Sequence, residues 1–259
     1  MATQQPHEEQ LLGSVADIAL LLLESGAETY RVEDSIQRIF CAYGIRNCQA
    51  FVIPSLILIS FVDEEGVSHS RIQRLLARPA NLSRVGAVND LCRRICRDRP
   101  PVEEIRQELE RCRRLPVWPL WVRALACILV GGSFTVIFGG GWADGVNAGL
   151  CSLGIFGARH MMLRLRTNTF FVHLASSSVA MVGALALLSL GLGHSLDLIV
   201  IGALMNLVPG LTITSFMRDI IAGDLVSGLV QLTEALLIAT AIALGSGFTL
   251  TLLRPLLGG

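Results

Sequence analysis

Carboxyl groups in the apolar second half of the chain are the side chains best suited to move protons. From residue 118 onwards the sequence has only six arginines and five acids, whereas the first 115 residues carry fifteen arginines and sixteen acids. An ionised side chain at the centre of a membrane helix costs about 2.5–3.5 kcal/mol on insertion scales. Glu234, about two and a half turns into the last apolar run, is therefore the first candidate for proton coupling, and a paired structural carboxyl is the alternative.

Further polar positions in this half are candidates for coupling or gating. Asp219 and Asp224 flank the short connection between the last two apolar runs. An ordinary turn, with an Arg218–Asp219 ion pair and with Asp224 capping the next helix, is the alternative there. Asp144, with Asn147 close behind it, stands at the start of an earlier apolar run, where the two could form an outer gate or an interface.

The sequence NLVPGLTITS interrupts the fourth apolar run near its middle. A proline there removes a helix hydrogen bond, so backbone amides and carbonyls are exposed where the bilayer is driest. Transporters use such breaks to hold polar substrates, although a helix that is merely kinked is the alternative. The candidate substrate-binding residues are those of the break and the hydroxyls that follow it: Asn206, Pro209, Gly210, Thr212, Thr214 and Ser215.

Apolar runs between residues 117 and 259 predict an all-α membrane domain of five transmembrane helices in a lipid bilayer. Five arginines lie where an inside amino terminus puts the cytoplasmic helix ends, which predicts an N-in, C-out orientation. Glycines along the runs permit close helix contacts, within the chain or in a homo-oligomer. The expected spans are residues 122–138, 142–158, 169–190, 196–217 and 225–250.

Residues 1–116 predict a cytoplasmic α+β domain. Apolar residues at helical spacing indicate two helices that meet near Gly26. The segment 49–74, rich in β-branched residues and interrupted by an acidic turn, predicts a hairpin or small sheet. Two more helices, over 81–97 and 102–114, complete this domain.

Composition excludes several classes of function. The chain has no lysine, so it lacks the residue that a Walker A loop or a Schiff base requires. Its formal charge is zero, which gives no basic footprint for nucleic acid. Cys92 and Cys96 would share a helix face, but no histidine stands near them, and no G-x-S-x-G pattern occurs. We therefore expect no catalytic residue, no metal and no cofactor.

Two stretches, SGAETYRVEDSI in the polar half and NLVPGLTITSFMRDIIAGDLVSGL in the apolar half, together resemble the threonine/serine exporter family. The likeness extends in the same order from about Leu11 to Gly247. Full-length members carry about twice as many spans in one chain, so this chain looks like the larger subunit of the split form, which works with a small membrane subunit. The positions that match the family's motifs are Gly26, Glu28, Arg31, Glu33, Pro209, Gly210, Asp219, Gly223, Asp224 and Gly228.

The resemblance implies a proton-coupled antiporter in the bacterial inner membrane, where it exports a small hydrophilic substrate from the cytoplasm. Threonine and serine are the substrates for which the family is named, and succinate or related dicarboxylates are the alternative. A membrane sensor or scaffold is a second alternative, in which Glu28, Arg31 and Glu33 would recognise a ligand or a partner.

Overall fold

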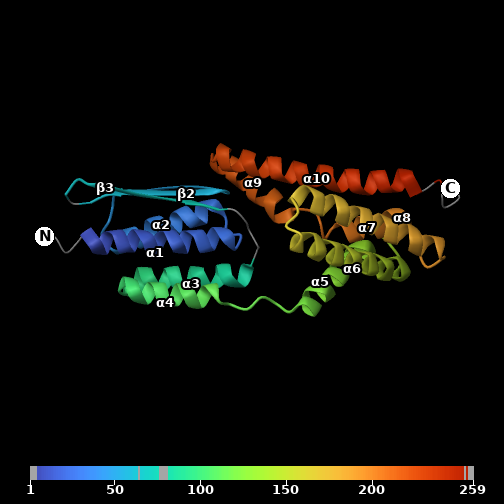
Figure 1. Ribbon diagram of the computed structural model, residues 1–259, viewed down its shortest axis with the longest axis horizontal. Helices are drawn as coiled ribbons and strands as arrows, with labels where there is room; N and C mark the ends of the chain where they lie inside the picture. The colour runs from blue at the N-terminus through green and yellow to red at the C-terminus, as the bar shows by residue number, and fades with distance from the viewer. Residues whose placement is uncertain (1–4, 64, 76–80, 254, 256–259) are drawn as a thin grey trace. The chain divides into compact units, whose positions relative to one another are not determined.

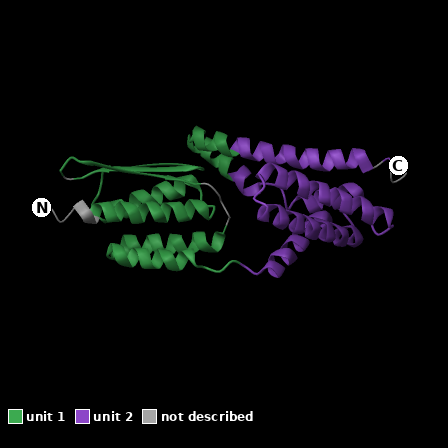
Figure 2. Ribbon diagram, viewed as in Figure 1, with its two compact units in different colours: residues 1–117, 215–231 green, residues 118–214, 232–259 purple. Residues whose placement is uncertain are grey.

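The described residues form ten helices and one three-stranded sheet, which divide into two compact units (Figures 1 and 2). Unit 1 contains the residues up to 117 together with 215–231, and unit 2 contains 118–214 and the residues from 232 onwards. A short segment of the apolar half therefore packs with the polar first half. The computed structural model describes residues 5–63, 65–75, 81–253 and 255.

Four helices of unit 1 surround one apolar core: α1 (Gln5–Glu24), α2 (Thr29–Ala42), α3 (Leu82–Asp98) and α4 (Val102–Arg113). On α1 ten of the thirteen residues from Leu11 to Leu23 are buried, as expected for a helix that its neighbours cover on most sides. Gly26, between α1 and α2, has a φ of 92°, which glycine adopts without steric strain. The expected meeting of two helices near this glycine is therefore confirmed.

A three-stranded antiparallel sheet completes the polar half of unit 1. Its strands β1 (Cys48–Ile53), β2 (Leu56–Val62) and β3 (Ser68–Arg74) lie in sequence order. Ile57, Ile59 and Phe61 alternate with more exposed residues along β2 and are almost completely buried, so one face of the sheet joins the core.

The last segment of unit 1 comes from the apolar half. It contains the end of α9 (Gly210–Ala222) and the start of α10 (Leu225–Leu253). Gly223 reverses the chain between them with a φ of 91°. A Cβ on Gly228 would lie 2.5 Å from Cγ1 of Ile220 and 3.3 Å from its backbone nitrogen, so the absence of a side chain lets the first turns of α10 pack closely against α9.

Unit 2 is entirely helical among its described residues, and its helices touch through small side chains. A Cβ on Gly202 would lie 1.9 Å from Oγ1 of Thr135 and 2.8 Å from the carbonyl oxygen of Gly131. The backbones of two helices therefore approach closely at this glycine, as in many membrane proteins. The helices that lie wholly in unit 2 are α5 (Leu120–Ile137), α6 (Trp142–Arg164), α7 (Thr169–Ser189) and α8 (Leu196–Leu204).

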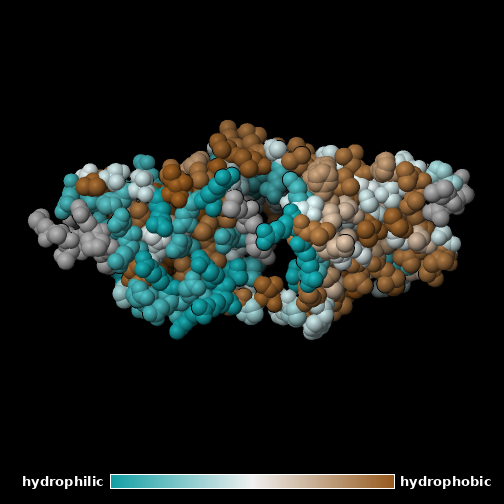
Figure 3. All heavy atoms as spheres, viewed as in Figure 1, coloured by the Kyte–Doolittle hydropathy of each residue, from teal (hydrophilic) through white to brown (hydrophobic). Residues whose placement is uncertain are grey.

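Exposed apolar side chains cover much of unit 2, whereas the visible face of unit 1 is mainly hydrophilic except over the α9–α10 segment (Figure 3). Exposed contiguous apolar surface of this kind is typical of a protein that contacts lipid or other chains. By length and composition, three helices among the described residues could cross a membrane: α5, α7 and α10.

The expected fold, an α+β cytoplasmic domain followed by five transmembrane helices with N-in, C-out orientation, is wrong. The chain is mainly helical with a small sheet, and unit 1 is not made of the first half alone. The run 196–217 is divided between α8 and α9, whose 9 and 13 residues extend only about 14 Å and 20 Å, short of a bilayer core of about 30 Å.

The run 142–158 became part of α6, which is rich in glycine and polar side chains and is not among the three apolar helices. The N-in, C-out orientation was inferred from the ends of five crossings, so it has no basis once the five crossings are corrected. The expected domain ranges, 1–116 and 117–259, stay a prediction.

Candidate functional site

A buried carboxylate on α9 joins the two sequence stretches that resemble the exporter motifs. Asp219 is 3% exposed, and its Oδ2 accepts three hydrogen bonds. Thr29 Oγ1 donates at 3.2 Å, Ser227 Oγ at 2.8 Å and Gln231 Nε2 at 2.6 Å. All three donors are uncharged, so hydrogen bonds rather than an ion pair compensate the burial of this carboxylate.

Three helices position these groups within unit 1. Thr29 is the first residue of α2, directly after the turn at Gly26 and the cap residue Glu28. Ser227 and Gln231 are one turn apart on α10, so their side chains project from the same face. The motif glycines therefore have a structural role, because they shape the turns and the close helix contact that bring the polar groups together.

Charged side chains flank two residues of this cluster, Thr29 and Asp219, along the chain. Arg218 Nη1 is paired with Glu28 Oε1, and Arg31 Nε lies 3.1 Å from Glu28 Oε2. The Arg218 guanidinium also lies over the ring of Tyr30, 5.6 Å from its centroid. These side chains are partly exposed, so each pair contributes little to stability, and their effect is to hold α2 and the end of α9 in register.

Glu33 adds a half-buried carboxyl to the buried one of Asp219. Its Oε1 accepts a hydrogen bond of 2.7 Å from the backbone amide of Val52. Burial raises the pKa of Glu33 above its ordinary value, the hydrogen bond from Val52 offsets part of this rise, and the negative charges of Asp224 and Asp219 add to it. Three motif acids therefore share one region of unit 1, which is electrostatically suited to a cation or a proton.

Asp224 caps α10. Its Oδ1 accepts a hydrogen bond of 3.2 Å from the amide of Ser227, and its own amide donates to the carbonyl of Asp219 at 2.9 Å. The capping role that was the alternative from the sequence is therefore seen in the structure. Arg218, in contrast, is paired with Glu28 rather than with the neighbouring Asp219.

The predicted break in the fourth apolar run is present, between α8 and α9. Asn206 Nδ2 donates to Ser152 Oγ at 3.0 Å and to the carbonyl oxygens of Ala203 and Cys127 at 3.2 and 3.3 Å. Its amide therefore ties the break to α5 and α6. Pro209 and Gly210 lie at the point where α9 begins.

The hydroxyl candidates that follow the break differ in their surroundings. Thr214 is exposed, and its Oγ1 donates to backbone carbonyls of its own helix at 3.0 and 3.2 Å. Thr212 and Ser215 are half-buried. The role of the six break residues in binding a substrate stays a prediction.

The remaining candidates lie in unit 2. Asp144 Oδ1 accepts hydrogen bonds from the amides of His194 and Ser195, at 2.7 and 3.4 Å, just before α8 begins. Asn147 Nδ2 donates to the carbonyl of Leu192 at 2.8 Å. These two side chains therefore hold the α7–α8 connection. Glu234, the first candidate for proton coupling, is exposed on α10.

Sequence reasoning missed the donors of the central cluster: Thr29, Ser227 and Gln231. Thr29 lies inside the first motif stretch but was not among the candidate residues. Ser227 and Gln231 gave a signal that could have been used, because they are polar residues at i, i+4 spacing on a mainly apolar helix. Their common partner, Asp219, could not be predicted from this spacing because it lies on another helix, α9.

Comparisons with known proteins assign the chain to a family. Residues 14–253 match the family model ThrE, described as "Putative threonine/serine exporter". The chain belongs to this family. It is similar to the "Probable threonine/serine exporter" of Mycobacterium tuberculosis, with 22% identity over 241 residues that are 92% of this chain and 45% of the relative.

It is also similar to the "Threonine/serine exporter" of Corynebacterium glutamicum, with 22% identity over 249 residues that are 93% of this chain and 51% of that protein. The chain thus spans about half the length of these curated relatives. No solved structure gives a significant match. Family membership and the three long apolar helices together make this a membrane protein.

Proposed function

We propose that this chain is part of a multi-pass exporter in the bacterial inner membrane, which moves threonine, serine or similar small amino acids out of the cell. Its family and its curated relatives, both named for threonine/serine export, support the substrate class. The observation that carries the proposal is the cluster at Asp219, because there one buried carboxylate binds side chains from both motif stretches.

The charge of the cluster favours an amino acid over a dicarboxylate. Asp219 is buried among neutral donors, and Glu33 and Asp224 add to the negative potential around it. Two like charges about 4 Å apart repel by about 4 kcal/mol at an effective dielectric constant of 20. The ammonium group of threonine or serine gains a similar amount from the same field, while succinate brings only negative charge.

Proton coupling is proposed to act through Asp219. The ionised carboxylate accepts from three donors at one oxygen, and bonds to a charged acceptor contribute about 1.5–3 kcal/mol each, against about 0.5–1.5 kcal/mol for neutral pairs. Protonation therefore weakens the hold of α9 on Thr29 and on the first turns of α10. A proton bound to Asp219 would weaken the contact of α2 with the α9–α10 segment inside unit 1. Transport requires a conformational change of this kind.

A second membrane chain is proposed to supply what the longer relatives carry in their remaining half. The match covers 45% and 51% of those relatives, and unit 2 exposes many large apolar side chains that another helical subunit could cover. A homo-oligomer is the competing arrangement.

Counterflow in proteoliposomes tests the proposal. The chain is reconstituted alone and with a co-expressed small membrane subunit, and uptake of labelled threonine, serine and succinate is measured with and without a pH gradient. We expect uptake of the amino acids, stimulated by the gradient and lost in Asp219→Asn. Asp197→Asn, the same chemical change at an exposed aspartate of unit 2, serves as the control and should transport normally.

The outcomes separate the alternatives. Uptake of succinate but not of the amino acids would replace the proposed substrate by a dicarboxylate. Absence of flux for every substrate, with the partner present, would favour a sensor or scaffold. Full activity of a folded Asp219→Asn protein would remove Asp219 from the coupling mechanism.

A further inference from the structure

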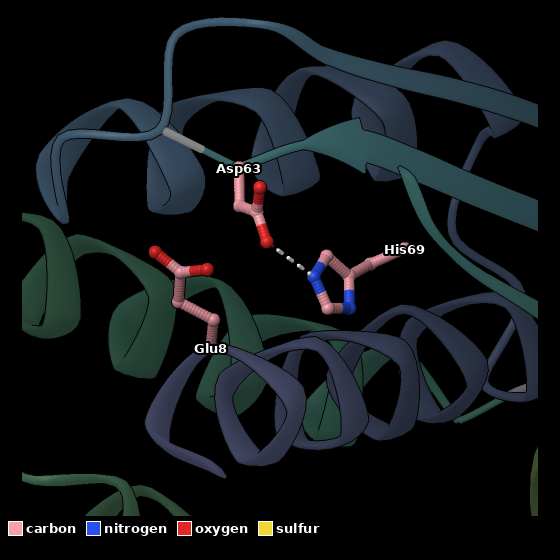
Figure 4. Close-up of side chains that lie close together, drawn as sticks. All are labelled: Glu8, Asp63 and His69. Atoms are coloured by element: carbon pink, nitrogen blue, oxygen red, sulfur yellow. Dashed lines mark hydrogen bonds and ion pairs between the residues drawn. The ribbon is translucent and has the colours of Figure 1, made fainter. Parts of the chain in front are cut away.

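Three potential metal ligands meet at the edge of unit 1, away from the cluster at Asp219. Glu8 lies near the start of α1, Asp63 follows β2, and His69 is the second residue of β3. Figure 4 shows the carboxylate of Glu8 facing the pair formed by Asp63 and His69. One ligand atom from each side chain lies within 4.8 Å of the other two. We propose that these three residues bind a divalent transition-metal ion such as Zn²⁺ or Mn²⁺.

The distance between two of these ligand atoms suits neighbouring ligands of one metal ion as well as it suits a hydrogen-bonded ion pair. Nε2 of His69 lies 2.9 Å from Oδ2 of Asp63. Adjacent ligands of an octahedral ion with bonds of about 2.1 Å are about 3 Å apart, so these two atoms already have the spacing of neighbouring ligands. Glu8 has a longer and more flexible side chain, so small torsional changes bring its carboxylate to the same ion.

The pair is held in place by its surroundings. Oδ1 of Asp63 accepts hydrogen bonds from the amides of Glu65 and Val67, at 3.0 and 2.8 Å, so its Oδ2 is directed at His69. The ring of Phe61 stacks on the imidazole with centroids 5.1 Å apart. The side chains of Asp63 and His69 are only 5% and 15% exposed, which limits competition by water. Ligands that are oriented in advance bind metal more tightly.

Charge balance points to a cation. Glu8 makes no ion pair with any other residue that the structure describes, and Asp63 has only His69 as a cationic partner within that part of the chain. Even with a protonated histidine the group keeps one net negative charge, and with a neutral histidine it keeps two. A divalent ion neutralises this charge and replaces the proton between imidazole and carboxylate.

The donor set selects the type of ion. Imidazole nitrogen together with carboxylate oxygens suits Zn²⁺, Mn²⁺ and related first-row ions, whereas Ca²⁺ and Mg²⁺ prefer oxygen ligands alone. With three protein ligands, water completes the coordination shell. The bound ion would tie the start of α1 to the β2–β3 connection.

Metal titration of the purified full chain tests this site. The protein is prepared in detergent, freed of any histidine tag, stripped with a chelator and desalted. Mn²⁺ binding is followed by the loss of its free electron paramagnetic resonance signal, and Zn²⁺, Mg²⁺ and Ca²⁺ are added as competitors. We expect one Mn²⁺ per chain, displaced by Zn²⁺ but not by equal concentrations of Mg²⁺ or Ca²⁺.

Single substitutions locate the ligands. His69→Ala and Glu8→Gln should each weaken binding about tenfold or more, because each removes a direct ligand. Glu9→Gln, at the exposed neighbour of Glu8 on the same helix, should bind like the wild type. Circular dichroism in the presence of chelator checks that each variant is folded. If the His69→Ala variant is not folded, the metal affinity of the Glu8→Gln variant tests the proposed site.

Two results would overturn the proposal: a wild-type chain that binds neither Mn²⁺ nor Zn²⁺ stoichiometrically, or a folded Glu8→Gln variant with unchanged affinity. Neither result bears on the proposed export function, since the site shares no residue with the cluster at Asp219.

Discussion

The hydrogen bond between Thr29 and Asp219 links residues 190 positions apart, and its strength can be measured with a double-mutant cycle. The substitutions are Thr29→Val, Asp219→Asn and both together. At 3.2 Å the bond is long, so the lower end of the range for a charged acceptor applies, about 1.5 kcal/mol. With the neutral amide of asparagine the same hydroxyl contributes about 0.5 kcal/mol. The expected coupling free energy is therefore about 1 kcal/mol.

The single variants should differ in size. Asp219→Asn turns three bonds to a carboxylate into bonds to a neutral oxygen, which removes about 1 kcal/mol each and about 3 kcal/mol in total. At about 4 °C per kcal/mol, the thermal midpoint of unit 1 should fall by about 12 °C. Thr29→Val loses this bond and the 3.4 Å bond that Thr29 Oγ1 accepts from Ser227 Oγ, and it buries an extra methyl group. The loss of the Ser227 bond and the gain from the methyl are common to both Thr29→Val variants, so they cancel in the cycle.

The assay is thermal unfolding of the full chain in detergent, followed by near-ultraviolet circular dichroism, with chemical denaturation as a second measure. The matched control is Thr214→Val with Asp219→Asn, because Thr214 is exposed and bonds only to its own helix. The control pair should be additive to within about 0.5 kcal/mol. If the Thr29 pair were equally additive, the hydrogen bond would not stabilise unit 1 and the argument for a shared motif site would fail.

Three further predictions concern packing, titration and thiol chemistry. Gly245→Ala should destabilise unit 2 by about 1–3 kcal/mol, since the new Cβ would lie 2.2 and 2.3 Å from two oxygens of α7. A Cβ at Gly247 would have nothing within 4 Å, so Gly247→Ala should stabilise α10 by up to about 1 kcal/mol. Thermal unfolding of the two variants checks both values. Burial raises the pKa of Glu33 above its ordinary 4.5, so its contribution to stability is fully present below that pH and is lost as the pH rises through the folded-state pKa. Glu33→Gln should therefore flatten the dependence of the thermal midpoint on pH in this window, and an unchanged slope would contradict the assigned burial effect. Burial raises the pKa of Cys92 to about 12, so maleimide at neutral pH should modify the exposed Cys41 much sooner than Cys92. Peptide mass spectrometry measures the two rates of modification. Equal rates would show that α3 opens readily.

Local features of the fold followed from the sequence because their causes are local. Pro209 cannot donate a helix hydrogen bond, so the interruption beside it was expected and is present. Gly26 marked the meeting of two helices for an equally local reason, since it takes a positive φ. The acidic segment after Val62 was likewise expected to separate two strands, and β2 and β3 lie on either side of it.

The number of long apolar helices was not predictable in the same way. A run of apolar letters does not show whether a helix continues through it, and the break at Pro209 left two pieces that are each too short to cross a bilayer. In α6 the glycines allow close packing, and Asp144 and Asn147 bond to the α7–α8 connection inside unit 2. A count of apolar residues does not take these roles into account.

The partners of the site residues depend on tertiary structure and could not be predicted from spacing. An ion pair between Arg218 and its neighbour Asp219 was the alternative considered from the sequence, yet Arg218 is paired with Glu28, which is far away in the sequence. Asp219 was a candidate for coupling, but its three donors become evident only when α2, α9 and α10 are placed together. The proximity of Glu8, Asp63 and His69 could not be predicted from the sequence for the same reason.

The assignment of residues 215–231 to unit 1 has a consequence for how the protein is made. A ribosome adds about 5–20 residues per second, so roughly 10–40 s separate the synthesis of Thr29 from that of the aspartate it binds, 190 residues later. The first four helices and the sheet can collapse in that time, but the hydroxyl of Thr29 and the carboxylate of Glu28 must wait for their partners. Nascent chains arrested before residue 215 should therefore be more sensitive to protease near the start of α2 than chains arrested after residue 231.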